Sequence, residues 1–239
     1  MNNENFTVGR ISPIEVYKEG WELIKSDYWL LFAITLVGVL IGGASLYILL
    51  GAMICGIFAC YLQKIDTGTV SFDNLWKGFS YIGPSLIVII IFIVPSLIIY
   101  GIIYAPILMA MAMGSKLSQD EFAGMMVGAA AIDLVLLTVV VCFHTLLMFA
   151  LPLIVDRNLS AFQAMKLSMK AVWKNLGGVI GMIGVYIVLC FLGALACGIG
   201  LYFMMPIIFA GFLTAYRRVF PAQNARNFNP PPPNVYQGI

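Results

Sequence analysis

YIGPSLIVIIIFIVPSLIIYGIIYAPILMAMAM, residues 81 to 113, contains no charged side chain. A helix needs about 20 consecutive apolar residues to cross a bilayer, and this run is longer than that. Three further apolar blocks cover residues 28 to 62, 122 to 155 and 176 to 216. They are continuously apolar, whereas the strands of a membrane barrel alternate apolar and polar residues. With 62% hydrophobic and 10% charged residues, the sequence predicts an all-α polytopic membrane protein.

The first and last blocks are too long for one crossing each. At about 1.5 Å per residue, a helix over residues 28 to 62 would be about 50 Å long, against a hydrocarbon core of about 30 Å. Gly42 and Gly43, followed by Ser45, lie near the middle of that block, and glycine readily reverses a chain. The segment GALACGIG at 193 to 200 is the expected turn of the last block. We therefore expect two spans from each outer block.

The two middle blocks allow two divisions. Each is either one crossing, with the polar segment GSKLSQDE at 114 to 121 between them, or a hairpin that returns to its starting side. Single crossings are favoured, because Asp133 and Asp156 bracket a span of ordinary length, Leu134 to Val155. Residues 119 to 133 then form a helical extension outside the hydrocarbon.

This extension carries its own start signal. Ser118 with Glu121 three residues later is a predicted capping box, in which the two side chains satisfy backbone amides at a helix start. Pro95 and Pro106 should kink or end the partner helix. The sequence thus predicts six transmembrane helices and a protruding, non-cytoplasmic hairpin near residues 104 to 133.

Positive charges assign the sides of the membrane. With six spans, 12 of the 13 Lys and Arg residues fall on one side, in the segments 1 to 27, 63 to 80, 156 to 175 and 217 to 239. Such an excess marks the cytoplasmic face, so both termini are predicted there, in a multi-pass protein of a bacterial cytoplasmic membrane. Only Lys116 lies opposite, and the hairpin division would place it inside too. The membrane domain covers residues 1 to 218, and a Pro-rich cytoplasmic tail follows at 219 to 239.

A basic, amphipathic stretch, SAFQAMKLSMKAVWKN, covers residues 160 to 175. Ser160 and Gln163 form a predicted capping box. We expect a helix in the membrane interface, with its lysines reaching anionic headgroups and its apolar face at the acyl boundary. The expected apolar face consists of Phe162, Met165, Met169 and Val172, and the lysines are Lys166, Lys170 and Lys174.

The same spacing of Ser, an acid or amide at +3 and Lys at +6 occurs twice more. It is found in SPIEVYK from Ser12 and in SFDNLWK from Ser71. The chain is therefore interpreted as three units, each with an interfacial helix, near 12–27, 71–80 and 160–175, followed by a pair of spans. The predicted headgroup contacts are Lys18, Lys77, Lys166, Lys170 and Lys174.

Several segments resemble those of a known family. They are LPLIVDRNLSAFQAMKLS at 151 to 168, ALACGIGL at 194 to 201, AYR at 215 to 217 and EGWELIK at 19 to 25. They look like signatures of uncharacterised bacterial integral membrane proteins related to the membrane domain of some glycerophosphodiester phosphodiesterases. The resemblance implies a fold and a membrane location but carries over no catalytic residue, because a phosphodiesterase barrel needs about 250 residues of its own.

Few residues suggest chemistry inside the membrane. His144, with Thr145 beside it and Asp133 eleven residues earlier, is a possible intramembrane polar site. A neutral His bonded to a nearby hydroxyl or carbonyl is the structural alternative and the favoured one. Neither an HExxH motif nor a phosphate-binding glycine loop is present, and no metal or cofactor is expected.

Three function classes follow from these observations. The leading one is a non-enzymatic structural or interaction component that packs with membrane partners or lipids. A small transporter or channel for a neutral or amphipathic solute is the second, and a lipid-handling enzyme or its anchor subunit is the third. The expected partners are the bilayer, its anionic headgroups and a membrane protein or second copy, with no nucleic acid.

Overall fold

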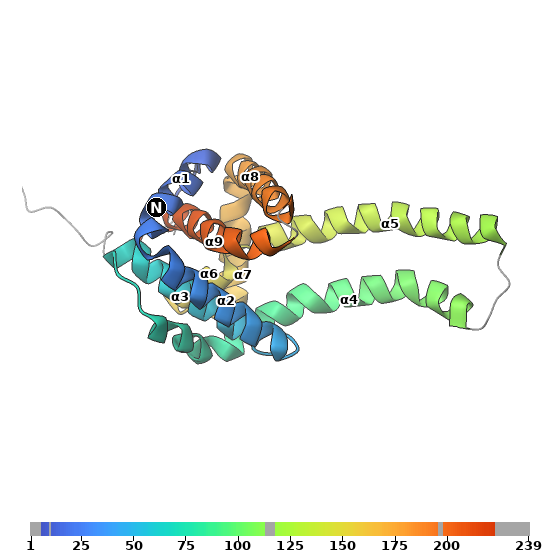
Figure 1. Cartoon of the computed structure of the whole chain (residues 1–239), viewed down its shortest axis with the longest axis horizontal. Coiled ribbons are helices and arrows are strands. Elements are labelled where there is room, and N and C mark those ends of the chain that lie inside the picture. Colours follow the sequence, from blue (N-terminus) through green and yellow to red (C-terminus); the bar gives the residue numbers. More distant parts are fainter. Residues whose placement is uncertain (1–5, 10, 113–117, 196–197, 223–239) are drawn as a thin grey trace, which may run out of the picture. The chain divides into compact units, whose positions relative to one another are not determined.

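The computed structural model describes residues 6–9, 11–112, 118–195 and 198–222. These residues form helices and turns, with no strand among them, so the all-α prediction is confirmed. Lys116 and the tail from residue 223, about which the sequence makes predictions, lie outside the described residues. The chain, whose helices Figure 1 colours along the sequence, divides into two compact units, one of residues 1–37, 57–75 and 174–239 and one of residues 38–56 and 76–173.

Five helical stretches of the described chain are long and apolar enough to cross a membrane. They are Pro13–Ala44, Phe72–Ala105, Gln119–Arg157, Leu176–Leu195 and Ile199–Val219. The third helix, α3 (Leu50–Thr67), is not among them, and its last turns hold Gln63, Lys64 and Asp66. A multi-pass membrane protein is what these helices indicate, whereas six spans in three units stays a prediction.

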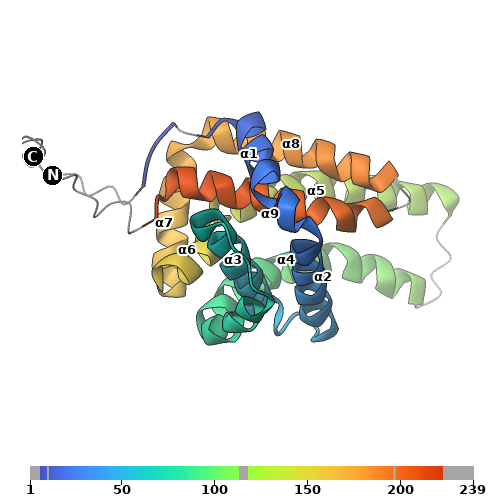
Figure 2. The ribbon, with the colours of Figure 1, turned by 60° about the vertical axis from the view of Figure 1, so that its left-hand side comes forward.

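The first unit packs three helices closely. The amphipathic helix α1 (Pro13–Ile24) lies across α8 (Leu176–Leu195) and α9 (Ile199–Val219), as Figure 2 shows. Two glycines permit this approach, because a Cβ on Gly20 would lie 2.7 Å from the backbone nitrogen of Gly211. A short 3-10 turn, η1 (Lys25–Asp27), leads from α1 into α2 (Tyr28–Ala44).

Both predicted turns of the outer blocks exist, but the residues that reverse the chain differ. Between α2 and α3 the positive φ angles belong to Leu46 (51°) and Tyr47 (68°), whereas Gly42 and Gly43 are helical. Gly42 serves packing instead, because a Cβ there would lie 2.9 Å from a Leu50 methyl carbon. Between α8 and α9 the prediction holds, with Gly198 at a φ of 80°.

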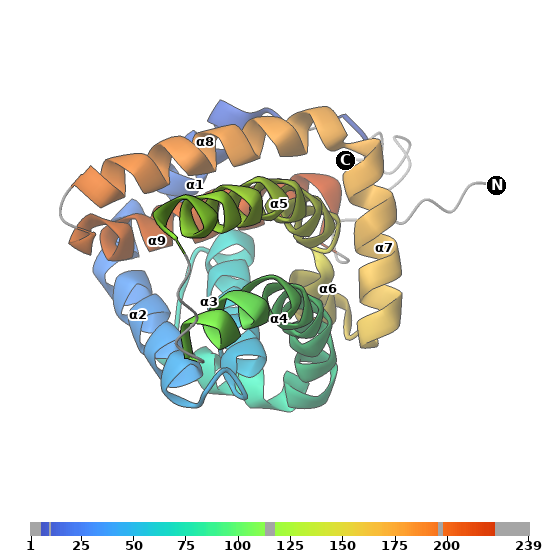
Figure 3. The same ribbon diagram turned by 90° about the vertical axis from the view of Figure 1, so that its right-hand side faces the viewer.

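The second unit contains a pair of long helices. The 3-10 helix η2 (Phe72–Tyr81) leads into α4 (Ile82–Ala112, 31 residues), and α5 (Gln119–Leu146, 28 residues) packs against α4. Figure 3 views this pair end on. Neither helix is interrupted by a turn, so neither α4 nor α5 folds back on itself as a hairpin. Helix α4 also continues past both Pro95 and Pro106. The Ser118 and Glu121 capping box at the start of α5 is confirmed.

A break divides the predicted span from Leu134 to Val155. Helix α5 ends at Leu146, and α6 (Ala150–Arg157) begins after a turn. The hydroxyl of Ser168, in α7 (Ala161–Lys174), joins the two ends, because it donates to the Leu146 carbonyl (2.9 Å) and accepts from the Phe149 amide (3.1 Å). One buried side chain therefore satisfies backbone groups that the break would leave unpaired.

Candidate lipid-contact surface

Helix α7 has one face buried in the protein and another exposed. The expectation that all four residues of the apolar face meet the acyl boundary is wrong: Met165 and Val172 are buried in the protein, whereas Phe162 (68% exposed) and Met169 (38%) are not. Small side chains cause the difference, because they let α7 approach its own unit closely on the side where they lie. The buried side chains are Ala161, Ala164, Met165, Ser168, Ala171 and Val172.

The exposed face of α7 combines aromatic and basic side chains. Phe162, Lys166, Met169 and Trp173 follow one another at helical spacing, and Lys170 lies beside them. All five are exposed, Trp173 by 69%. We call these five residues the α7 outer stripe. Large exposed apolar side chains next to lysines are typical of a helix that lies in a membrane interface.

Two other helices each expose a similar group. On α1, Ile14, Lys18 and Trp21 are exposed, with the same spacing as Phe162, Lys166 and Met169. The second lies on η2, where Lys77 is exposed. It lies between Trp76 and Phe79 in the sequence, and the rings of these two residues stack with their centroids 6.2 Å apart.

The capping boxes predicted for these helices differ in outcome. The Ser12 hydroxyl makes no capping bond. Asn74 donates its side-chain amide to Gln63, and Gln163 accepts a hydrogen bond from the Ser160 amide at 3.3 Å. All five predicted headgroup lysines, Lys174 included, are exposed.

Other basic side chains are held in ion pairs of the first unit. Buried Lys64 contacts Asp27, Ser26 and the Gly68 carbonyl. Further pairs join Arg217 to Asp66 and Arg218 to Glu15 and Glu19. These cations already have protein partners, so exposed Lys18, Lys77, Lys166 and Lys170 are the better candidates for headgroup contact.

His144 and Asp133, the two ends of the predicted polar site, make separate contacts, as their separation of eleven residues along one helix requires. The His144 Nε2 atom lies 3.3 Å from the Phe92 carbonyl oxygen, and the two rings are 4.7 Å apart between centroids. Thr145 is half-buried beside it. Asp133, farther along α5, instead accepts a hydrogen bond from the Tyr104 hydroxyl at 2.6 Å. The structure therefore places His144 and Asp133 in two separate contacts between α4 and α5.

Asp133 has one oxygen without a donor. Its Oδ1 atom is buried and accepts no hydrogen bond from the described part of the chain. Leaving a buried acceptor unpaired costs about 1–3 kcal/mol, and more for a charged group. This oxygen stands out because the other carboxylate oxygen of the same side chain is paired.

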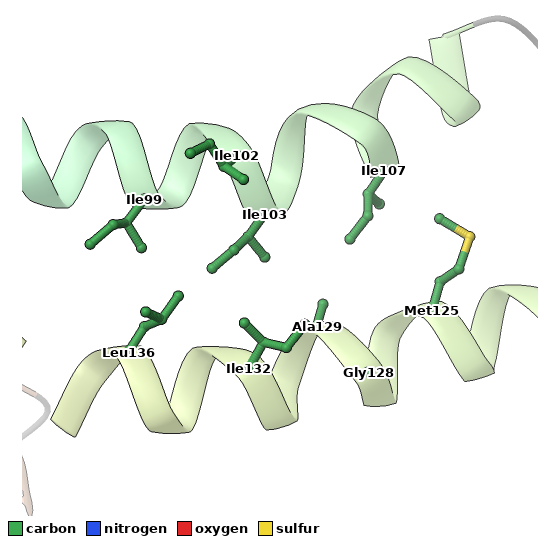
Figure 4. Close-up of a pocket in the computed structure, with 9 residues that line it drawn as sticks. All are labelled: Ile99, Ile102, Ile103, Ile107, Met125, Gly128, Ala129, Ile132 and Leu136. Atoms are coloured by element: carbon green, nitrogen blue, oxygen red, sulfur yellow. The ribbon is translucent and has the colours of Figure 1, made fainter. Parts of the chain in front are cut away.

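An apolar groove of about 580 Å³ lies between α4 and α5 beside this pair. Figure 4 shows that side chains from both helices point into it. The lining residues are Ile99, Ile102, Ile103, Ile107, Met125, Gly128, Ala129, Ile132 and Leu136. The groove can hold an apolar chain, but its walls offer no group for catalysis.

Sequence reasoning missed three residues of these sites. Trp173 shares a face with Phe162 and Lys166 at spacings of eleven and seven residues, so a full helical projection would have found it. Tyr104 and Ser168 gave no such signal, because their partners are 29 and 22 residues away and are brought close only by helix packing.

Comparison with known proteins adds no family assignment. The resemblance to the membrane domain of glycerophosphodiester phosphodiesterases therefore stays an expectation from short segments. No family model, no curated protein and no solved structure matches this chain.

Proposed function

We propose that this chain is a non-enzymatic, multi-pass membrane protein that binds anionic lipid headgroups at the membrane surface and organises lipid or membrane partners there. The α7 outer stripe is the observation that carries the proposal. Its lysines are exposed beside Phe162 and Trp173, while the opposite face of α7 is buried in the protein. A helix fixed in this way presents its charges and its aromatic rings together to a bilayer surface.

The two interactions reinforce each other. A lysine near an anionic membrane contributes about 1 kcal/mol, so Lys166 and Lys170 together contribute about 2 kcal/mol. Trp and Phe favour the headgroup level, where an apolar ring can be buried beside polar groups. Lys18 with Trp21, and Lys77 with Trp76, offer the same chemistry on α1 and η2.

The sidedness follows from the same lysines. We place both termini and the three basic helices on the cytoplasmic side of a bacterial membrane, because short loops rich in Lys and Arg are retained there. Six spans require that α3 crosses as well. The ion pair between Lys64 and Asp27 supports this, because it joins the end of α3 to the start of α2, as expected for two spans that cross and return to the same side.

Quenching of Trp173 fluorescence tests the proposal. The protein with Trp21, Trp29 and Trp76 changed to Phe retains Trp173 alone. It is placed in nanodiscs of phosphatidylcholine and phosphatidylglycerol, with brominated chains on one lipid or on the other. If the stripe gathers anionic lipid, brominated phosphatidylglycerol should quench Trp173 more strongly than brominated phosphatidylcholine at equal mole fraction.

Charge variants provide the control. Lys166→Glu with Lys170→Glu should remove the preference for the anionic lipid, and Lys166→Arg with Lys170→Arg should keep it. Quenching by fully brominated bilayers shows whether Trp173 still contacts lipid in each variant. Equal quenching by the two brominated lipids in the parent protein would contradict the proposal.

A further inference from the structure

We propose that the groove between α4 and α5 binds one acyl chain of a lipid whose headgroup carries an ammonium group, and that Asp133, with Tyr100 and Tyr104, receives this ammonium group. The site is separate from the α7 outer stripe and selects a headgroup with an ammonium group, whereas the stripe selects a headgroup with net negative charge. Two observations carry the inference, the apolar groove and the unpaired carboxylate oxygen at its edge.

The groove fits an apolar chain. Its volume, about 580 Å³, is in the range of ligand sites, which is about 300–1,000 Å³. Isoleucine side chains from α4 face Met125, Ile132 and Leu136 of α5 across the gap (Figure 4). Gly128 leaves room in the wall, because no atom lies within 4 Å of the position of its missing Cβ.

The edge of the groove fits a cation with hydrogen-bond donors. Tyr104 satisfies Asp133 Oδ2, and Oδ1 is buried without a donor among the described residues. An ammonium group supplies both the donor and the opposite charge. The rings of Tyr100 and Tyr104 stack 6.2 Å apart, and tyrosine faces attract cations within about 6 Å.

The charge of the surrounding helices excludes an anionic headgroup. From residue 82 to residue 146 the sequence has three carboxylates, Asp120, Glu121 and Asp133, against one lysine, Lys116. A headgroup phosphate without an amine would be repelled by Asp133, whereas a headgroup that ends in an ammonium group can place this group against the carboxylate.

The position along the helices suits a headgroup. Tyr104 lies about 33 Å along α4 from its first residue, Ile82, at about 1.5 Å per residue. A hydrocarbon core is about 30 Å thick, so a helix that enters the bilayer at Ile82 brings Tyr104 and Asp133 to the opposite headgroup level. The acyl chain then runs back into the bilayer past Ile99 and Leu136, which line the groove.

Native mass spectrometry of the full protein released from nanodiscs tests the site. The nanodiscs contain equal amounts of phosphatidylethanolamine and phosphatidylglycerol with identical chains, and the retained lipids are counted. We expect one phosphatidylethanolamine per protein, and Asp133→Asn should reduce its retention by about tenfold or more, the effect of losing a charged hydrogen bond. Asp120→Asn, an acid on the same helix away from the groove, should retain it.

A second pair of variants tests the groove itself. Leu136→Trp, in the wall that the acyl chain passes, should fill this part of the groove and abolish retention, whereas Leu137→Trp, at an exposed neighbouring position that does not line the groove, should not. Soluble ethanolamine, which has the headgroup chemistry without a chain, should not displace the lipid.

Three results would overturn the inference. The first is equal retention of phosphatidylethanolamine by Asp133→Asn and Asp120→Asn. The second is competition by ethanolamine that Leu136→Trp leaves unchanged. The third is a lipid-free dimer that Leu136→Trp converts to monomer, because a second copy would then occupy the groove. None of these results bears on the quenching of Trp173, so the two proposals fail independently.

Discussion

His144 acts on the backbone of a neighbouring helix. A carbonyl oxygen can only accept, so His144 Nε2 must carry the proton in its contact with Phe92 O. The hydroxyl of Ser96 donates to the same oxygen at 3.1 Å. Pro95 lies in the same turn of α4 and lacks the N–H that would bond the carbonyl of Ile91, one residue before Phe92, and neighbouring helices and hydroxyl groups commonly satisfy backbone groups near such a proline. This environment favours the structural alternative for His144.

His144→Gln should therefore change little. The glutamine amide can donate to Phe92 O, so the free energy of unfolding should stay within about 0.5 kcal/mol, and His144→Leu should cost about 1 kcal/mol for the lost hydrogen bond. Thermal unfolding in detergent measures both. A normal unfolding curve together with the loss of lipid or partner binding in His144→Gln would show that the imidazole has a functional role.

The glycines show how helices in this chain come together. Three pairs at four-residue spacing, such as Gly177 with Gly181, have the small-residue pattern of close helix packing. A Cβ on Gly181 would collide with the Pro13 ring, but one on Gly124 or Gly128 would meet nothing within 4 Å. The same pattern thus marks a tight contact in one helix and an open surface in another.

Gly20→Ala tests the tight contact between α1 and α9. The new methyl group would lie 2.7 Å from Gly211 N and 2.8 Å from Ala210 C. Backbone atoms cannot rotate away, so we expect a loss of about 1–3 kcal/mol in the free energy of unfolding. Gly184→Ala, inside α8 with open space at its Cβ position, is the matched control and should raise stability by up to about 1 kcal/mol. Equal unfolding temperatures for the two variants would show that α1 and α9 are not in tight contact.

For the whole molecule, the distribution of charge predicts the orientation in the membrane. Ion pairs hold Lys64, Arg217 and Arg218 inside the first unit. These pairs do not weaken the orientation argument, because topology is set by positive residues during insertion, whether or not they later find a partner.

Cysteine labelling in intact cells checks this orientation. In a protein whose five native cysteines are replaced, Lys116→Cys should react with an impermeant thiol reagent, and Gln223→Cys should react only after the membrane is opened. Labelling at 223 from outside would reverse the orientation. Labelling at 116 only after permeabilisation would place it on the side of the termini, which the continuous helices α4 and α5 argue against.

The sequence alone determined the features that depend on local composition. Continuous apolar blocks long enough to span a bilayer predicted a helical protein. The spacing of Ser118 and Glu121 correctly predicted where α5 begins. Gly198 marked a true turn for the same reason, since a positive φ angle strains most other residues. The same reasoning from glycine positions was wrong at Gly42, because Leu46 and Tyr47 turn the chain instead.

Only the tertiary structure decided what depends on contacts between distant segments. It showed that small residues turn α7 so that Met165 is buried and Phe162 is exposed, and that Ser168 joins α5 to α6. It also placed Tyr104 against Asp133. Helical periodicity gives the position of each residue around one helix axis. Which face of the helix packs against the protein depends on the shape of the neighbouring helix, and no local sequence pattern encodes that shape.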